Sequence, residues 1–189
     1  MMALYLFIGT VSFLVMALSD WLCVIKGFKN GACLFIAGCL MLSGATLGML
    51  ASGPFHNGSI LLSAMSWCGV VLMLALLVHS VFFVLHSNGS SGLPASSGEK
   101  YPLVCTGVYA LCRHPGVLWL CGVYLFLWCA CGGIHWLTAT VLFTAADAAY
   151  AYWQDHMIFP LSIENYAHYQ KETPFLLPTP GSVRRFLGG

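Results

Sequence analysis

The feature that most restricts the fold of this chain is a series of long apolar stretches that are almost free of charged residues. A helix needs roughly 20 apolar residues to cross about 30 Å of hydrocarbon, and backbone within lipid must satisfy its own hydrogen bonds. Five stretches meet this requirement, approximately Ala3–Ile25, Ala32–Ala51, Ile60–Leu85, Pro115–Cys131 and Ile134–Met157. The sequence therefore predicts an all-α integral membrane bundle of about five transmembrane helices, in a single domain over residues 1–189.

The low content of charged residues supports lipid as the main solvent. Only 7% of the 189 residues are charged, whereas a soluble domain averages about 25%. The net charge of +1 provides no basic surface, so nucleic acid is not an expected partner. The nine cysteines form no Cys-x-x-Cys pair and are predicted to be buried small hydrophobic residues, with no metal site.

The basic residues predict the orientation of the bundle. They fall between the first and second spans, between the third and fourth, and after the fifth (Lys26, Lys29, Lys100, Arg113, Lys171, Arg184 and Arg185). The positive-inside rule assigns such connections to the cytosol. We therefore expect a multi-pass protein with its N-terminus outside and its C-terminus in the cytosol. Because only Gly132-Gly133 separates the last two spans, they are expected to form an antiparallel hairpin.

The segment Arg113-His114-Pro115 is the strongest candidate for a binding site. Pro115 suits the first position of a helix, and a residue that precedes proline is usually extended. Arg113 and His114 are therefore expected just outside the N-terminus of the fourth span. Free N–H groups, the helix dipole and a guanidinium together can receive a carboxylate or phosphate. The alternative is an interfacial arginine that only anchors the end of a helix.

Two sequence blocks carry a resemblance to a known family. Gly107-x-Tyr109 followed by Arg113-His114-Pro115 resembles the signature of the isoprenylcysteine carboxyl methyltransferases, a family that itself resembles phospholipid N-methyltransferases. The second block ends the next helix and here reads WQDHMIFPLSIENYAHYQKETPFLLPTP, with a short helix expected in SIENYAHYQKE. The resemblance covers roughly residues 100–180, the expected cofactor-binding half, whereas residues 1–86 add three N-terminal spans. The chain departs from the family pattern at Val108, Val117 and Gln154-Asp155.

This resemblance implies that S-adenosylmethionine binds at the cytosolic face and that a lipophilic or membrane-associated thiol, carboxylate or amine accepts the methyl group. In this interpretation Arg113 binds the methionyl carboxylate, and Asp155 binds the amino group or a ribose hydroxyl. Tyr166 and Tyr169 cover the adenine or face the sulfonium. Trp153 is included among the cofactor contacts because it flanks Gln154-Asp155. The implied cofactor contacts are Gly107, Tyr109, Arg113, His114, Pro115, Trp153, Asp155, Tyr166 and Tyr169.

Polar residues inside the spans add further candidates. Asp147 lies deep in the fifth span, where an acid is costly and usually faces protein or water. We expect Asp147 and Tyr150 to line the acceptor cavity, with Asp155 about 80° from Asp147 around the helix. An interhelical hydrogen bond is the alternative role for Asp147. Asp20 is expected at the cytosolic interface, paired with Lys26.

Three residues are candidates for a direct part in catalysis, namely Arg113, His114 and His86. His86 shares a face of the third span with His79 and lies at its cytosolic end, where it could act as a general base. A packing histidine is the alternative. Because the sequence offers no strong general base, an acceptor that is already ionised, such as a thiolate or a carboxylate, is favoured.

Other functions and assemblies also fit parts of the sequence. Gly38, Gly44 and Gly48 in the second span predict close helix packing, and Gly44-x-x-x-Gly48 would also suit a homodimer. A membrane reductase with a nicotinamide cofactor is an alternative enzyme, although the chain is short for one. A transporter would need polar residues in several spans, and a scaffold could bind lipid headgroups through the Arg-His-Pro loop.

Overall fold

The computed structural model describes residues 1–28, 30–53, 60–84 and 100–188. About 81% of the described residues are helical, and none of them forms a β-strand. Three described helices are long and apolar enough to cross a bilayer, at Met2–Ile25, Cys33–Ser52 and Ile60–Val81, and Pro115–Cys131 is a shorter apolar helix. The all-helical prediction is confirmed, and the three long apolar helices indicate a membrane protein.

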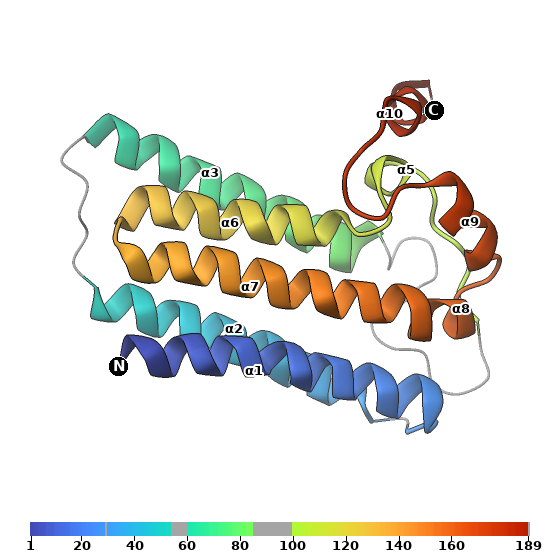
Figure 1. Cartoon of the computed structure of the whole chain (residues 1–189), viewed down its shortest axis with the longest axis horizontal. Helices are drawn as coiled ribbons and strands as arrows, with labels where there is room; N and C mark the ends of the chain where they lie inside the picture. Colours follow the sequence, from blue (N-terminus) through green and yellow to red (C-terminus); the bar gives the residue numbers. More distant parts are fainter. Residues whose placement is uncertain (29, 54–59, 85–99, 189) are drawn as a thin grey trace.

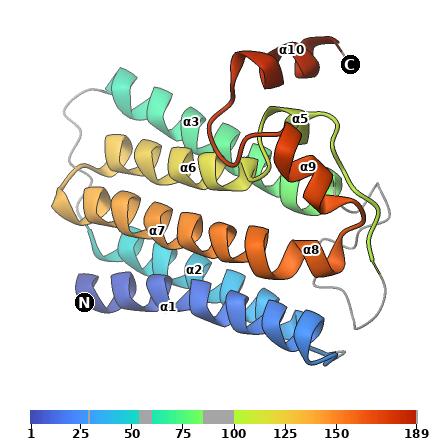
Figure 2. The same ribbon diagram turned by 45° about the vertical axis from the view of Figure 1, so that its right-hand side comes forward.

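The five long helices of the described residues, α1, α2, α3, α6 and α7, lie side by side along the molecule (Figures 1 and 2). α1 packs against α2, α3 packs against α6, and α7 contacts both α6 and α1. Three of the long helices continue as short π-helical segments, called η1 to η3. The bundle elements in chain order are α1 (Met2–Asp20), η1 (Trp21–Ile25), α2 (Ala32–Ser52), α3 (Ile60–Val78), η2 (His79–Val84), α6 (Pro115–Cys131), α7 (Ile134–Trp153) and η3 (Gln154–Ile158).

The turn between α6 and α7 reverses the chain at Gly132-Gly133, as predicted. Both glycines have positive φ angles, 71° and 80°, a region that residues with a Cβ atom rarely adopt. The two helices pack against each other along the bundle. This antiparallel hairpin places the start of α6 and the end of α7 at the same end of the molecule (Figure 1).

Glycines allow α1 and α2 to approach closely. A Cβ atom added at Gly38 would lie 2.6 Å from Cγ of Met16 and 3.0 Å from the carbonyl oxygen of Ser12, and one at Gly48 would overlap the ring of Tyr5. A Cβ atom at Gly44 would meet no described atom within 4 Å. Close packing is therefore confirmed at Gly38 and Gly48 but is wrong for Gly44, because that glycine faces away from α1.

The core of the bundle forms where α1, α6 and α7 meet. Phe143 of α7 is fully buried, and its ring lies 4.9 Å from that of Tyr124 and 6.5 Å from that of Phe13. The hydroxyl groups of Tyr124 and Thr46 are 2.7 Å apart, which connects α6 to α2. These contacts hold the α1–α2 pair and the α3–α6 pair on either side of α7.

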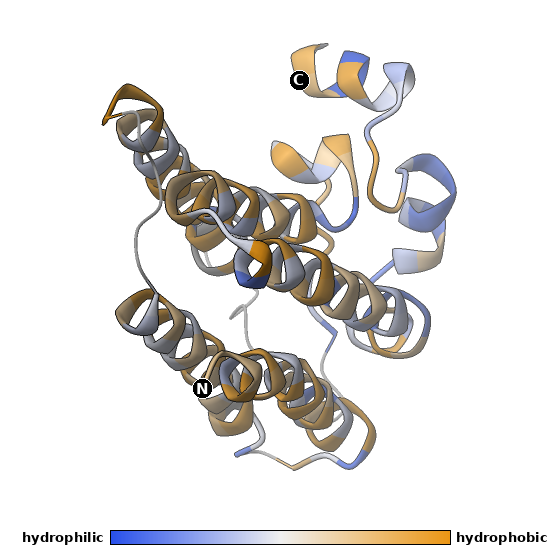
Figure 3. Ribbon diagram, turned by 60° about the vertical axis from the view of Figure 1, so that its left-hand side comes forward, coloured by the Kyte–Doolittle hydropathy of each residue, from blue (hydrophilic) through white to orange (hydrophobic). Residues whose placement is uncertain are grey.

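The short helices gather at the end of the bundle opposite the N-terminus (Figure 1). They are α5 (Val108–Leu111), α8 (Phe159–Ser162), α9 (Tyr166–Glu172) and α10 (Pro180–Gly188). In Figure 3 the long helices are mainly hydrophobic, whereas α9 is hydrophilic. The helix α10 was not among the elements identified from the sequence. Pro180 occupies its first position, which proline tolerates.

Candidate functional site

The Arg113-His114 segment is held in place by the C-terminal tail. The N–H of Arg113 donates to the carbonyl of Pro174 at 2.9 Å, and the N–H of His114 donates to that of Phe175 at 3.2 Å. His114 has φ −124° and ψ 63°, outside the helical region, and Pro115 then begins α6. The predicted start of this helix is therefore confirmed, and the tail fixes the direction in which the two side chains leave the backbone.

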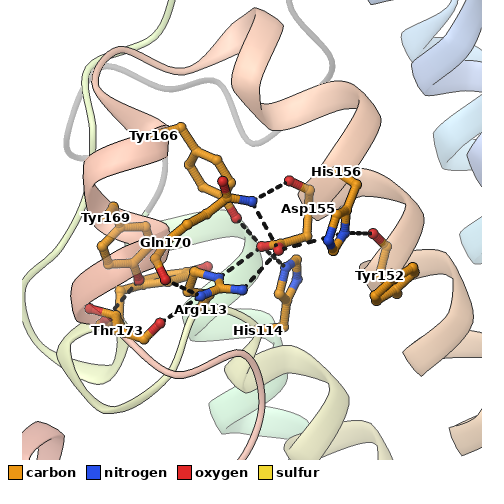
Figure 4. Close-up of polar contacts among 10 residues, drawn as sticks. Arg113, His114, Tyr152, Asp155, His156, Tyr166, Tyr169, Gln170 and Thr173 are labelled. Atoms are coloured by element: carbon orange, nitrogen blue, oxygen red, sulfur yellow. Dashed lines mark hydrogen bonds and ion pairs between the residues drawn. The ribbon is translucent and has the colours of Figure 1, made fainter.

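The guanidinium of Arg113 is directed at protein groups on all sides (Figure 4). Nε and Nη2 donate to the two carboxylate oxygens of Asp155, each at 2.9 Å. Nη1 donates to the carbonyls of Gln170 and Thr173, at 2.8 and 2.6 Å. The expectation that Arg113 would bind a cofactor carboxylate with its whole fork is wrong for this structure, because Asp155 already occupies that position.

Asp155 is the centre of this polar network and is fully buried. Besides Arg113, its carboxylate accepts hydrogen bonds from His114 at 3.1 Å, Tyr166 at 2.5 Å and Gln170 at 3.1 Å. Burial alone would raise the pKa of Asp155, but the bonds from His114, Arg113 and Tyr166 outweigh it and hold the pKa well below 3.8. With its acceptor positions engaged by protein donors, this carboxylate fixes its neighbours, and its contact with a cofactor stays a prediction.

His114 is buried within this network. Burial lowers its pKa below the ordinary value of 6.5, although the hydrogen bond and the charge of Asp155 act in the opposite direction. Because an ionised carboxylate can only accept, Nε2 of His114 carries the proton that Asp155 receives. The ring also stacks on Phe159 at 5.6 Å and meets the edge of Phe175 at 5.0 Å.

The lowered pKa of His114 predicts that acid destabilises this end of the molecule. Below pH 6.5 the unfolded chain binds a proton at His114 that the folded chain does not, so stability falls as the pH decreases. Asp155 adds a second loss near and below pH 3.8, where the unfolded chain protonates its carboxyl first. His114 should therefore contribute a decrease in the thermal unfolding midpoint in detergent between pH 7 and pH 5, measured as the difference between the unaltered chain and a variant without the imidazole.

His114→Gln tests the source of this acid sensitivity, since glutamine can donate to Asp155 but does not titrate. We expect a weaker dependence of the unfolding midpoint on pH in this variant. The matched control is His168→Gln, because His168 lies on α9 with a 73% exposed side chain. If the pH dependence of the unfolding midpoint weakened equally in both variants, the role of His114 would be contradicted.

Three tyrosines connect the short helices to this network. The hydroxyl of Tyr109 donates to the carbonyl of Ser80 at 3.1 Å, and that of Tyr169 donates to the carbonyl of Tyr109 at 2.6 Å. Burial raises the pKa of Tyr109, Tyr166 and Tyr169 above the ordinary value of 10. All three therefore remain neutral phenols that donate hydrogen bonds and present aromatic faces.

A cavity of about 410 Å³ adjoins this network and continues into the bundle between the α1–α2 and α3–α6 pairs. Its walls are mainly apolar side chains, with a few polar groups among them. Eight of the residues predicted as site residues line this one cavity, and they are Tyr109, Arg113, His114, Pro115, Asp147, Tyr150, Tyr166 and Tyr169. The structure therefore brings the two sequence blocks and the expected acceptor residues together.

Three predicted contact residues do not line the cavity. Gly107 is exposed and precedes α5 with a φ angle of 57°. Trp153 stacks on Tyr150 with ring centroids 6.5 Å apart, and Asp155 faces Arg113. Consecutive helical residues point about 100° apart, so Gln154 reaches the cavity while its neighbour Asp155 points elsewhere. The expectation that Asp147 and Asp155 line the same cavity is wrong.

The cavity also contains residues that were not assigned to the site. Asp20 lines it and pairs with Tyr150 and Gln154, at 2.5 and 2.8 Å. The expected pair with Lys26 is absent, because the Lys26 ammonium lies 5.0 Å from the ring centre of Trp21. An acid at the end of an apolar span was the available signal for Asp20. Val117, which replaces a tyrosine of the family pattern, also lines the cavity.

Two further expectations concern His86 and metals. His86 lies outside the described residues, so its role as a base stays a prediction. Within the described parts of the chain, no group of three or more His, Cys, Asp or Glu side chains is placed to hold a metal ion.

No protein-family model, curated protein or solved structure matches this chain.

Proposed function

We propose that this protein is a membrane-embedded methyltransferase, which uses S-adenosylmethionine to methylate a lipophilic acceptor at the cytosolic face. The observation that carries the proposal is the convergence of two distant blocks on one cavity. Tyr109 and Arg113-His114-Pro115 line it together with Tyr166 and Tyr169. These are the positions that the resemblance to isoprenylcysteine carboxyl methyltransferases implies for cofactor binding.

The proposed membrane arrangement has five spans, formed by α1, α2, α3, α6 and α7. The connection between α1 and α2, and the helices α5, α9 and α10, all lie at the end opposite the N-terminus (Figure 1). These segments carry or adjoin the basic residues, which favours a cytosolic position for that end. The N-terminus would then lie outside and the C-terminus in the cytosol, with the cavity opening toward the cytosol.

The residues of the cavity fit a cofactor of this kind. A volume of about 410 Å³ falls within the usual range for small-molecule sites. The faces of Tyr166 and Tyr169 can cover the adenine or stabilise the sulfonium cation. His114, Pro115 and Gly116 place the first turn of α6 at the wall, where the positive end of the helix dipole favours a carboxylate. In this arrangement the guanidinium of Arg113 holds the residues of the cavity wall in place. It does not bind the cofactor carboxylate through two parallel hydrogen bonds.

The proposed methyl transfer requires few reactive groups from the protein. The cofactor supplies an activated methyl group, and transfer is an in-line displacement that needs no metal ion and no covalent nucleophile. The chain must align the donor and acceptor and exclude water, and both effects can contribute several kcal/mol. The apolar walls from α1, α2, α3 and α6 serve to exclude water from the cavity.

Calorimetric titration of S-adenosylhomocysteine into the detergent-purified chain tests this proposal. We expect saturable binding that Gly116→Phe weakens by at least about tenfold, or about 1.4 kcal/mol. A Cβ atom at Gly116 would lie 3.7 Å from Leu77 and 3.8 Å from Val81, so a larger side chain there would fill part of the cavity.

Two variants control for general damage to the fold. Gly44→Phe introduces the same side chain at a position that meets no described atom within 4 Å, and binding should not change. Gly116→Ala adds only an ordinary van der Waals contact and should retain binding. A monodisperse, folded sample of the unaltered chain that does not bind S-adenosylhomocysteine would refute the proposal.

A further inference from the structure

An acidic patch lies within the mainly apolar cavity, and its side chains make no hydrogen bond to those of the Arg113–Asp155 pair. It consists of Asp20 from α1, Asp147 and Tyr150 from α7, and Gln154 from η3, all of which line the cavity. The residues at 147, 150 and 154 follow each other at intervals of three and four, so they share one helical face. Asp20, at the end of α1, meets this face from the neighbouring helix.

Part of the patch is internally satisfied. The hydroxyl of Tyr150 donates to Oδ2 of Asp20 at 2.5 Å. The amide of Gln154 donates to the same oxygen and to the Tyr150 hydroxyl, both at 2.8 Å. These contacts hold the Asp20 carboxylate in one orientation, although only 4% of the residue is exposed.

Several acceptor positions in the patch have no donor. Oδ1 of Asp20 receives no hydrogen bond within the described part of the chain, and neither oxygen of Asp147 receives one. A carboxylate offers about four acceptor positions, and acceptors without partners in apolar surroundings are costly. Acceptors of Asp20 and Asp147 that line a mainly apolar cavity therefore favour a bound group that donates hydrogen bonds.

No described cation neutralises the patch. Arg113 is paired with Asp155 at 2.9 Å, and the ammonium of Lys26 lies over the ring of Trp21. Two carboxylates in apolar surroundings favour a cation and repel an anion. Much of the remaining wall is formed by apolar side chains from four helices, among them Phe13, Leu42, Leu74, Leu77 and Leu120.

From these contacts we infer that the acidic patch receives the nitrogen of a lipophilic amine, so that the methyl acceptor is an amine, and not a thiol or a carboxylate. The inference rests on the proposed methyltransferase function and names its substrate class. An ionised thiolate or carboxylate, which the lack of a strong base in the sequence favoured, would be repelled by Asp20 and Asp147. The apolar walls would hold the hydrocarbon part of the amine.

The reaction then balances with one proton released. The bound ammonium transfers a proton to the carboxylate of Asp147, which leaves a lone pair on the nitrogen. That lone pair forms a bond to the methyl carbon while the carbon–sulfur bond breaks, and the electrons of that bond stay on sulfur. The products are a methylated ammonium and neutral S-adenosylhomocysteine, and Asp147 later releases its proton to water.

Dodecylamine, dodecanethiol and dodecanoate, which share one alkyl chain, provide the test. Methyl transfer from labelled S-adenosylmethionine to each is measured with the detergent-purified full chain. We expect transfer to the amine, with a KM at least about tenfold higher in Asp147→Asn and in Asp20→Asn. Asp147→Asn is the more informative variant, since the Asp147 side chain makes no hydrogen bond to another described residue that the substitution could break.

The affinity for S-adenosylhomocysteine, measured by calorimetry on the same samples, should not change in either variant. Glu164→Gln makes the same chemical change at an exposed position outside the cavity and should leave all values unchanged. Preferential methylation of the thiol or the carboxylate, or amine kinetics that Asp147→Asn does not affect, would overturn the inference. An equal loss of cofactor affinity in Asp147→Asn would also overturn it, because the acids would then serve the cofactor.

Failure of the proposed function gives a different result. The unaltered chain would bind no S-adenosylhomocysteine and would methylate none of the three probes. Direct calorimetric binding of dodecylamine then still tests the patch. Binding that Asp147→Asn weakens would support an amine site without methyl transfer, whereas no preference for dodecylamine over dodecanoate would overturn it.

Discussion

Replacing Asp155 by alanine should destabilise the chain by about 3–5 kcal/mol, the range observed when one partner of a buried ion pair is removed. The carboxylate is fully buried and receives both edges of the Arg113 fork. Its loss would leave the guanidinium without a counter-ion and would remove the acceptor of His114 and Tyr166. We expect a large decrease in the thermal unfolding midpoint in detergent, together with loss of S-adenosylhomocysteine binding.

The control for Asp155→Ala is Glu164→Ala, which removes an exposed carboxylate at the same end of the molecule. Its effect should stay within about 0.5 kcal/mol. A double-mutant cycle with Arg113→Met and Asp155→Leu should show that the two losses are not additive, with a coupling of up to about 3 kcal/mol. Additive losses, or an Asp155→Ala protein as stable as the control, would show that the pair does not hold this end together.

Gly38→Leu should separate α1 from α2 and destabilise the bundle by about 1–3 kcal/mol or more, as overpacking does in a filled core. A Cβ atom at this position would lie 3.0 Å from a backbone oxygen of Ser12, and backbone cannot move aside as a flexible side chain can. Both helices also line the cavity, through Met16 and Cys39 among others. Binding of S-adenosylhomocysteine should therefore weaken together with the unfolding midpoint.

Gly44→Leu is the matched control, because it places the same side chain in the same helix where no described atom lies within 4 Å. Its unfolding midpoint in detergent should equal that of the unaltered chain. If both substitutions lowered the unfolding midpoint equally, the loss of stability would come from replacing any glycine of α2. The contact between α2 and α1 would then not be its cause. A Gly38→Leu protein of full stability would contradict the close packing of these two helices.

The elements of the bundle could be predicted closely from local sequence. Long apolar runs must become helices in lipid, and the observed helices begin and end within a few residues of the predicted spans. Pro115 starts α6 and Gly132-Gly133 reverses the chain as expected, because a fixed φ angle and freedom at positive φ are properties of single residues. The residues at the end of the bundle that carries the short helices were also identified, since the sequence pairs Arg113-His114-Pro115 with a tyrosine-containing tail.

The partners of those residues depended on the tertiary structure. Gln154 and Asp155 are neighbours in sequence, yet Gln154 contacts Asp20 and Asp155 contacts Arg113. The 100° rotation between consecutive helical residues separates them, but only the packing of α1 and the path of the tail decide what each one meets. The sequence by itself determined a chain of membrane-suited helices with polar segments at one end. The tertiary structure decided that Arg113 and Asp155 neutralise each other, and that Asp20 and Asp147 line the cavity without a paired cation among the described residues. The reason is that contacts between residues distant in sequence depend on where whole helices pack.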